Sequence, residues 1–116
     1  MLKDLVLKNR SYRRFNQSAA IEKKTLLEFI DLARNTPSGR NLQTLKYFVS
    51  ADKETNARIY PTLAWAGYLK DWAGPVEGER PSGYIVIMED ALIGKNLVHD
   101  QGIVAQTILL AAVEKG

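Results

Sequence analysis

An almost unbroken aliphatic segment near the end of the chain restricts the possible folds most. Between Gly102 and Val113 only Gly102, Gln106 and Thr107 are not aliphatic, and the segment fits a helix from about Asp100 to Lys115. A surface helix has a single apolar stripe, so a helix that is apolar nearly all round must be covered on every side. A chain of 116 residues has room for one modest core. We therefore expect this helix to pack against a partner subunit or against further chain.

The rest of the sequence predicts a mixture of helices and strands. Apolar spacing indicates a short helix over residues 2–9 and an amphipathic helix over 22–35, which Thr36-Pro37-Ser38-Gly39 ends. Strands are expected at 47–49 and 83–89, and the continuous apolar run 84–88 is typical of a central strand buried on both faces. Asp52 is a candidate N-cap for a short helix that Pro61 interrupts or ends, and residues 61–82 are expected to form an irregular loop with its own aromatic packing.

Composition excludes several classes of protein. The chain has no cysteine, which rules out disulfides and thiolate metal sites and is compatible with a reducing cytoplasm. The longest unbroken apolar run, Ile108 to Val113, is far shorter than the roughly 20 residues that span a bilayer. His99 and Asp100 are adjacent, which is a poor arrangement for a metal pair. We expect a soluble cytoplasmic protein with one domain over residues 1–116, no metal site and no membrane contact.

A dense cluster of donors directly follows the first predicted helix. Residues 1–14 hold five basic residues against Asp4 alone, and three of the five lie in the run Arg10-Ser11-Tyr12-Arg13-Arg14-Phe15. Guanidinium forks and a serine hydroxyl are well suited to a phosphomonoester. The same run could be solvated surface, or a nucleic-acid patch in which Tyr12 and Phe15 stack on bases. Because the positive charge is confined to one segment, we favour a small anionic ligand over nucleic acid.

A second candidate site lies where the amphipathic helix gives way to the first strand, in the run Pro37-Ser38-Gly39-Arg40-Asn41-Leu42-Gln43. The proline and glycine alone could serve only to end the helix. Asn41 and Gln43 add two amides that can each donate and accept, as recognition of the edge of a heteroaromatic ring requires. The sequence has no glycine-rich phosphate loop between a strand and a helix, and no histidine base accompanies Ser11 or Ser38 in its own segment.

Taken together, the run Asn9–Phe15, the run Pro37–Thr44 and the aliphatic segment 100–112 resemble the nitroreductase family of flavoproteins, over nearly the whole chain. The resemblance implies an α+β fold with a central mixed sheet flanked by helices, and a homodimer with FMN at the subunit interface. Arg10, Ser11 and Arg13 would hold the phosphate and ribityl chain. Ser38, Gly39, Asn41 and Gln43 would approach the flavin across the dimer. Family members are longer, so we expect this chain to be an N-terminal portion that lacks the C-terminal part.

The function implied by the resemblance is an FMN-dependent oxidoreductase. Electrons would pass from NAD(P)H through the flavin to a small acceptor such as a nitroaromatic or a quinone, and no side-chain acid or base is needed. The alternative is a non-catalytic FMN-binding or dimeric interaction protein, including a truncated family member.

Overall fold

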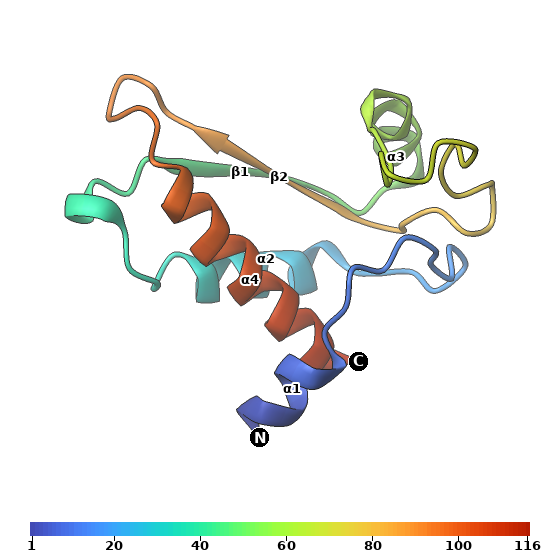
Figure 1. Ribbon diagram of the computed structural model, residues 1–116, viewed down its shortest axis with the longest axis horizontal. Helices are drawn as coiled ribbons and strands as arrows, with labels where there is room; N and C mark the ends of the chain where they lie inside the picture. Colours follow the sequence, from blue (N-terminus) through green and yellow to red (C-terminus); the bar gives the residue numbers. More distant parts are fainter.

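The computed structural model describes residues 1–116 and contains four α-helices and a two-stranded sheet (Figure 1). In chain order the elements are α1 (Leu2–Lys8), α2 (Lys23–Ala33), β1 (Leu45–Ser50), α3 (Lys53–Ile59), β2 (Tyr84–Glu89) and α4 (Val98–Lys115), with 3₁₀ turns at Gly39–Asn41 and Tyr60–Thr62. Each predicted helix and strand is present within a few residues of its expected bounds. None of the helices combines the length and apolarity that crossing a bilayer requires.

Local sequence accounts for the ends of α3. The side chain of Asp52 accepts a hydrogen bond from the Thr55 backbone N–H at 2.9 Å, as an N-cap does. Pro61 lies in the 3₁₀ turn that follows the helix, because proline cannot donate the next helical hydrogen bond. Both expectations about this segment are confirmed.

The sheet differs from the prediction. β1 and β2 pair antiparallel, with Phe48 opposite Val86, and neither strand has a second neighbour. The expectation that residues 84–88 form a central strand buried on both faces is wrong, since Val86 and Met88 are 39% and 44% exposed. The expected central mixed sheet is likewise absent from this chain, which forms only the antiparallel pair. The apolar run of β2 does not correspond to burial on two faces, because only one face of the sheet is covered in this chain.

The core lies where α2 meets α4 and the covered face of the sheet (Figure 1). Its buried apolar side chains are Leu26, Phe29 and Ala33 of α2 together with Val104 of α4. Only 9 of 116 residues are buried, so the core is small for the length of the chain. Helix α4 buries one face, whereas Ile103 and Leu109 are 37% and 47% exposed. Within this chain, therefore, the aliphatic helix is not covered on every side.

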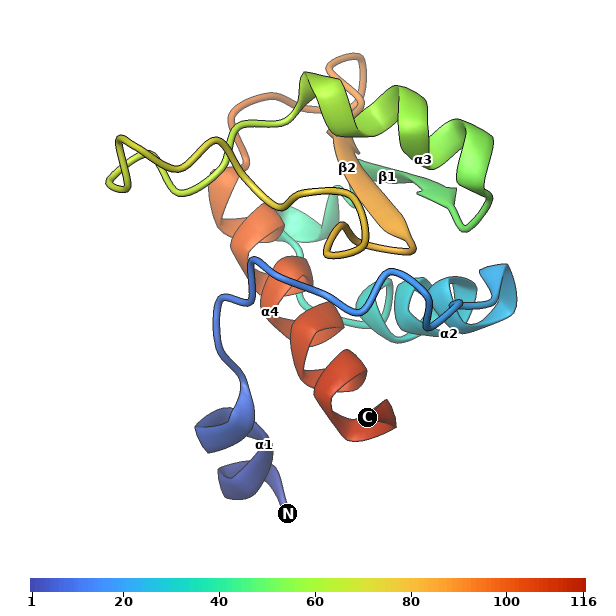
Figure 2. The same cartoon turned by 90° about the vertical axis from the view of Figure 1, so that its right-hand side faces the viewer.

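The segment between α3 and β2 is the expected irregular loop, and it packs around its own aromatic residues. The Trp65 ring lies 6.1 Å from that of Tyr60 and 6.5 Å from that of Trp72. Backbone hydrogen bonds tie the end of this loop to the segment that follows α1: the Phe15 N–H donates to the Glu79 carbonyl, and the Gln17 N–H donates to the Gly78 carbonyl. The loop and the N-terminal segment thus run side by side, as Figure 2 shows.

Candidate functional site

The segment after α1 presents the predicted phosphate donors to solvent. Helix α1 ends at Lys8, the backbone of Asn9 is extended, and Arg10 and Ser11 are exposed, whereas Arg13 is half-buried. The Arg10 guanidinium donates to the Asn9 carbonyl at 2.7 Å, and that of Arg13 donates to the Ser11 carbonyl at 3.1 Å. Neither arginine has an acidic partner, and each guanidinium keeps further N–H donors. These three residues can therefore offer charge-assisted hydrogen bonds to an anion.

Arg14 belongs to the same run but contacts an acidic residue and an aromatic ring. Its Nε lies 3.8 Å from Glu79 Oε2, and its guanidinium lies over the Trp72 ring at 5.9 Å from the ring centre. A carboxylate neighbour offsets its charge, so Arg14 is a weaker anion ligand than Arg10 or Arg13. The run thus contains two arginines without an acidic partner, Arg10 and Arg13, and a third, Arg14, that pairs with Glu79 of the loop.

The second predicted group forms a compact loop around a carboxylate. The Ser38 hydroxyl donates to Asp100 Oδ2 at 2.5 Å, and the Gly39 N–H donates to Oδ1 at 2.9 Å. Ser38 Oγ also accepts from the Gln43 N–H at 3.0 Å, while the Gln43 side-chain amide donates to Asn41 Oδ1 at 2.7 Å. Asn41 and Gln43 have φ values of 54° and 52°, in the left-handed region. These hydrogen bonds hold an otherwise unfavourable loop in one shape.

Asp100 was not foreseen as a site residue. It is 4% exposed, and the Ser38 hydroxyl, followed by the Gly39 N–H, holds the pKa of its carboxyl below the usual value. In the sequence this aspartate adjoins His99, a poor arrangement for a metal pair, and no neighbouring residue indicates its contact with Ser38. The available signal was an acidic residue in the first turn of an otherwise aliphatic helix. The structure contains no cluster of histidine, aspartate or glutamate residues that could hold a metal ion.

The two predicted groups do not meet within one chain. Both groups bond to α4. In the run Asn9–Phe15, called the arginine segment below, Asn9 donates to Gln106 at 3.5 Å, whereas Ser38 donates to Asp100 at the start of the helix. Figures 1 and 2 show the arginine segment and the 3₁₀ turn at Gly39–Asn41 on opposite sides of α4. A ligand that touches both groups would need one of them from another chain.

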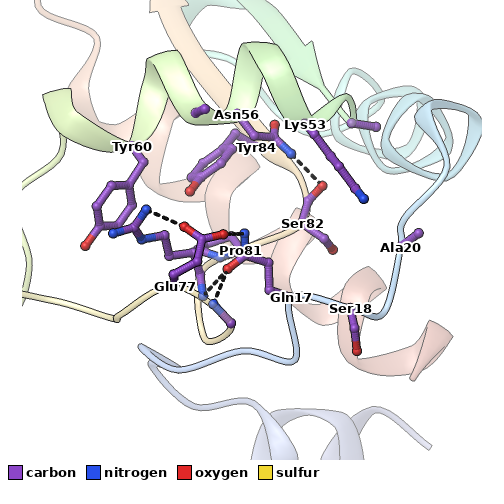
Figure 3. Close-up of a pocket in the computed structure, with 14 residues that line it drawn as sticks. Gln17, Ser18, Ala20, Lys53, Asn56, Tyr60, Glu77, Pro81, Ser82 and Tyr84 are labelled. Atoms are coloured by element: carbon purple, nitrogen blue, oxygen red, sulfur yellow. Dashed lines mark hydrogen bonds and ion pairs between the residues drawn. The ribbon is translucent and has the colours of Figure 1, made fainter.

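A wider cleft lies elsewhere, and its lining contains none of the predicted residues. It has a volume of about 650 Å³ and lies between α3 and the segments around Gln17 and Arg80 (Figure 3). Most of its polar groups pair with one another: Gln17 accepts from the Gly78 N–H at 2.7 Å, Arg80 bonds Glu77 at 2.7 Å, and Asn56 donates to the Ser82 carbonyl at 2.8 Å. Because these groups serve to join segments, the uncommitted donors of the arginine segment are the stronger candidate site.

A smaller cavity lies beside the second group. Its volume is about 130 Å³, and its lining includes Ser38, Gln43, Tyr47 and Asp100. Burial raises the pKa of the Tyr47 phenol, which therefore stays protonated at neutral pH.

Comparison with known proteins now gives the family. The model of the nitroreductase family matches residues 6–82, a range that includes both candidate groups. The chain belongs to the nitroreductase family. The resemblance seen in the sequence is thereby confirmed, whereas the search of curated proteins finds no match.

Solved nitroreductase-type structures share the fold. A protein assigned as a nitroreductase from Desulfovibrio desulfuricans, solved in complex with FMN, superposes with a TM-score of 0.74 at 21% identity, over 98% of this chain and 63% of its own. An FMN-dependent nitroreductase from Clostridium difficile gives 0.71 at 27% identity, over 97% and 60%. Iodotyrosine deiodinase bound to FMN and 3-iodo-L-tyrosine gives 0.73 at 20% identity, over 100% and 71%. The fold is therefore the α+β nitroreductase fold, and the chain spans about three fifths of the length of the two nitroreductases.

Proposed function

We propose that this chain binds FMN as part of a nitroreductase-type oxidoreductase that takes electrons from NAD(P)H and passes them to a small acceptor such as a nitroaromatic or a quinone. The observation that carries the proposal is the donor trio Arg10, Ser11 and Arg13, in which Arg10 and Ser11 are exposed, Arg13 is half-buried, and neither guanidinium group has an acidic partner. This donor set fits the phosphate of FMN, because guanidinium and hydroxyl donors match phosphate oxygens in charge and in geometry.

The residues of the chain bind and orient the cofactor in this proposal. Arg10, Ser11 and Arg13 hold the phosphate and the adjoining ribityl hydroxyls. Ser38, Gly39, Asn41 and Gln43 offer amide, hydroxyl and backbone groups toward the edge of the ring system. When bound, FMN supplies the redox chemistry between a nicotinamide and the acceptor, so no side-chain acid or base is required.

A homodimer is part of the proposal. The two groups lie on opposite sides of α4 within one chain (Figures 1 and 2), so a second copy supplies the loop around Ser38 to the arginine segment of the first. Helix α4 leaves aliphatic side chains exposed, among them Ile103 and Leu109, and these suit an interface with that copy.

The test compares two flavins that differ only in the phosphate. The double variant Arg10→Ala/Arg13→Ala is expected to bind FMN at least about tenfold more weakly, since each charge-assisted contact contributes about 1.5 to 3 kcal/mol, while riboflavin affinity changes little. Titration followed by flavin fluorescence measures both affinities. Arg14→Ala is the matched control, because Glu79 already offsets that charge.

Equal losses for the two flavins would show that these arginines do not read the phosphate. If the wild-type chain takes up no FMN, the proposal fails. Steady oxidation of NAD(P)H in the presence of a nitroaromatic then separates an oxidoreductase from a protein that binds FMN without catalysis.

A further inference from the structure

Tyr68 makes an unexplained contact with one of the proposed phosphate ligands. The Arg13 guanidinium carbon lies 5.4 Å from the centre of the Tyr68 ring, within the range of a cation–π contact. Tyr68 itself is 71% exposed, in the irregular loop that precedes β2. A large aromatic side chain left so exposed contributes little to the core, so burial does not account for its position beside Arg13.

We propose that Tyr68 is a positioning residue that holds the Arg13 guanidinium ready for the phosphate of the cofactor, an inference that rests on the proposed function. A free arginine side chain samples many rotamers, and ordering it on binding weakens the affinity for its ligand. The cation–π contact with Tyr68 restricts the guanidinium beforehand. One guanidinium N–H group donates to the Ser11 carbonyl, and the other donors remain available to phosphate oxygens.

The loop is fixed well enough to hold the ring in place. Its far end bonds to the arginine segment through the Phe15 N–H and the Glu79 carbonyl at 2.8 Å. Within it, the Leu69 N–H donates to the Ala66 carbonyl at 2.7 Å, which closes a turn around Tyr68. These bonds attach the loop and the segment to each other at one end and keep the backbone near Tyr68 ordered.

The contact between Arg14 and Trp72 can be compared with that between Arg13 and Tyr68. Arg14 also lies over an aromatic ring, that of Trp72, but its Nε is 3.8 Å from a Glu79 carboxylate oxygen. Arg13 has an aromatic contact and no acidic partner. Its charge therefore remains available to an anion, whereas that of Arg14 is offset.

The experiment measures the affinities of FMN and riboflavin for the full chain by flavin fluorescence. Tyr68→Ala is expected to lower the FMN affinity about twofold to fivefold, and to leave the riboflavin affinity unchanged. Tyr68→Phe keeps the ring and is expected to retain the wild-type ratio of the two affinities. Leu69→Ala, which truncates an apolar side chain in the same loop, is the matched control and is expected to retain that ratio as well.

Measurements in the Arg13→Ala variant distinguish a failure of the positioning role of Tyr68 from a failure of the proposed function. If Tyr68 acts through Arg13, Tyr68→Ala has no further effect on FMN affinity in that background. If Arg13→Ala weakens FMN but Tyr68→Ala does not, the positioning role is overturned and the proposed function stands. If Arg13→Ala leaves FMN affinity unchanged, Arg13 does not read the phosphate, and both proposals fail at this residue.

Discussion

The Ser38 hydroxyl donates a hydrogen bond of 2.5 Å to Asp100, a residue 62 positions further along the chain. The Gly39 N–H donates to the other oxygen of the same carboxylate. This pair of contacts fixes the loop after α2 to the first turn of α4, and it joins the second predicted group to the aliphatic helix. The stability of the fold should depend on this buried carboxylate, because removing its charge weakens both hydrogen bonds together.

Asp100→Asn is expected to lower the melting temperature at neutral pH. The folded-state pKa of Asp100 is below its unfolded value, so the ionised group stabilises the fold at pH values above about 4 and loses that contribution as the pH falls through the folded pKa. The difference between wild type and variant should therefore shrink as the pH falls from about 5 to about 2. Thermal unfolding followed by circular dichroism at a series of pH values measures it.

The control for this experiment is Asp31→Asn. Asp31 pairs with Arg34 at 2.7 Å, but its side chain is 66% exposed, and surface pairs of this kind contribute about 0 to 1 kcal/mol. The two variants should therefore differ clearly at pH 7. A pH-independent loss in Asp100→Asn would contradict the assigned role of the carboxylate.

Alanine substitutions at three glycines of the irregular loop distinguish the energetic cost of a positive φ from that of a steric clash. A Cβ at Gly74, where φ is 109°, would lie 2.6 Å from Trp65 Cδ1. Gly78 has a φ of 95° but open space around it, and Gly67 has open space without a positive φ. Alanine at Gly78 is expected to cost about 1 to 3 kcal/mol, Gly74→Ala more, and Gly67→Ala less than about 0.5 kcal/mol.

Urea unfolding followed by tryptophan fluorescence ranks these glycine variants, and a shift in the native emission reports displacement of Trp65. Similar losses at positions 67 and 74 would contradict the close contact between Gly74 and the indole.

Local sequence signals were enough to predict much of the fold. Helix α2 followed from the spacing of its apolar residues, and the start of α3 followed from Asp52, because each depends on contacts within a few residues. Two short runs, Arg10–Phe15 and Pro37–Gln43, indicate the two candidate groups through the chemistry of their own side chains. These features share one property, which is that their physical cause lies in a short stretch of chain.

The remaining features depend on contacts between distant segments. Nothing near Asp100 in the sequence indicates that Ser38 will bond to it. The apolar run of β2 was expected to be central, yet apolar residues alone do not say how many neighbouring elements a chain provides, and Val86 remains exposed. The cation–π contact between Arg13 and Tyr68 likewise joins two segments through the course of a long loop, which no periodicity describes.

Thr44→Val is expected to stabilise the protein or leave its stability unchanged. Thr44 is fully buried, and its Oγ1 has no hydrogen-bond partner. A buried hydroxyl without a partner costs about 1 to 3 kcal/mol, and valine has nearly the same shape without that group. Thr36→Val is the matched control, because the Thr36 hydroxyl donates to the Ala33 carbonyl at 2.6 Å, and its loss should cost about 0.5 to 1.5 kcal/mol. Urea unfolding gives both values, and a marked loss in Thr44→Val would mean that its hydroxyl is satisfied.

Leu109→Glu tests the proposed dimer at the exposed face of α4. Leu109 is 47% exposed in one chain, so a glutamate there remains hydrated in the monomer but is desolvated in an interface. We expect self-association to weaken by at least about tenfold, as measured by sedimentation velocity over a range of concentrations. Leu92→Glu is the control, since Leu92 is 98% exposed in the turn after β2 and lies outside α4. A wild-type chain that stays monomeric at every concentration would argue against the dimer, whereas equal association of the two variants would place the interface away from this face of α4.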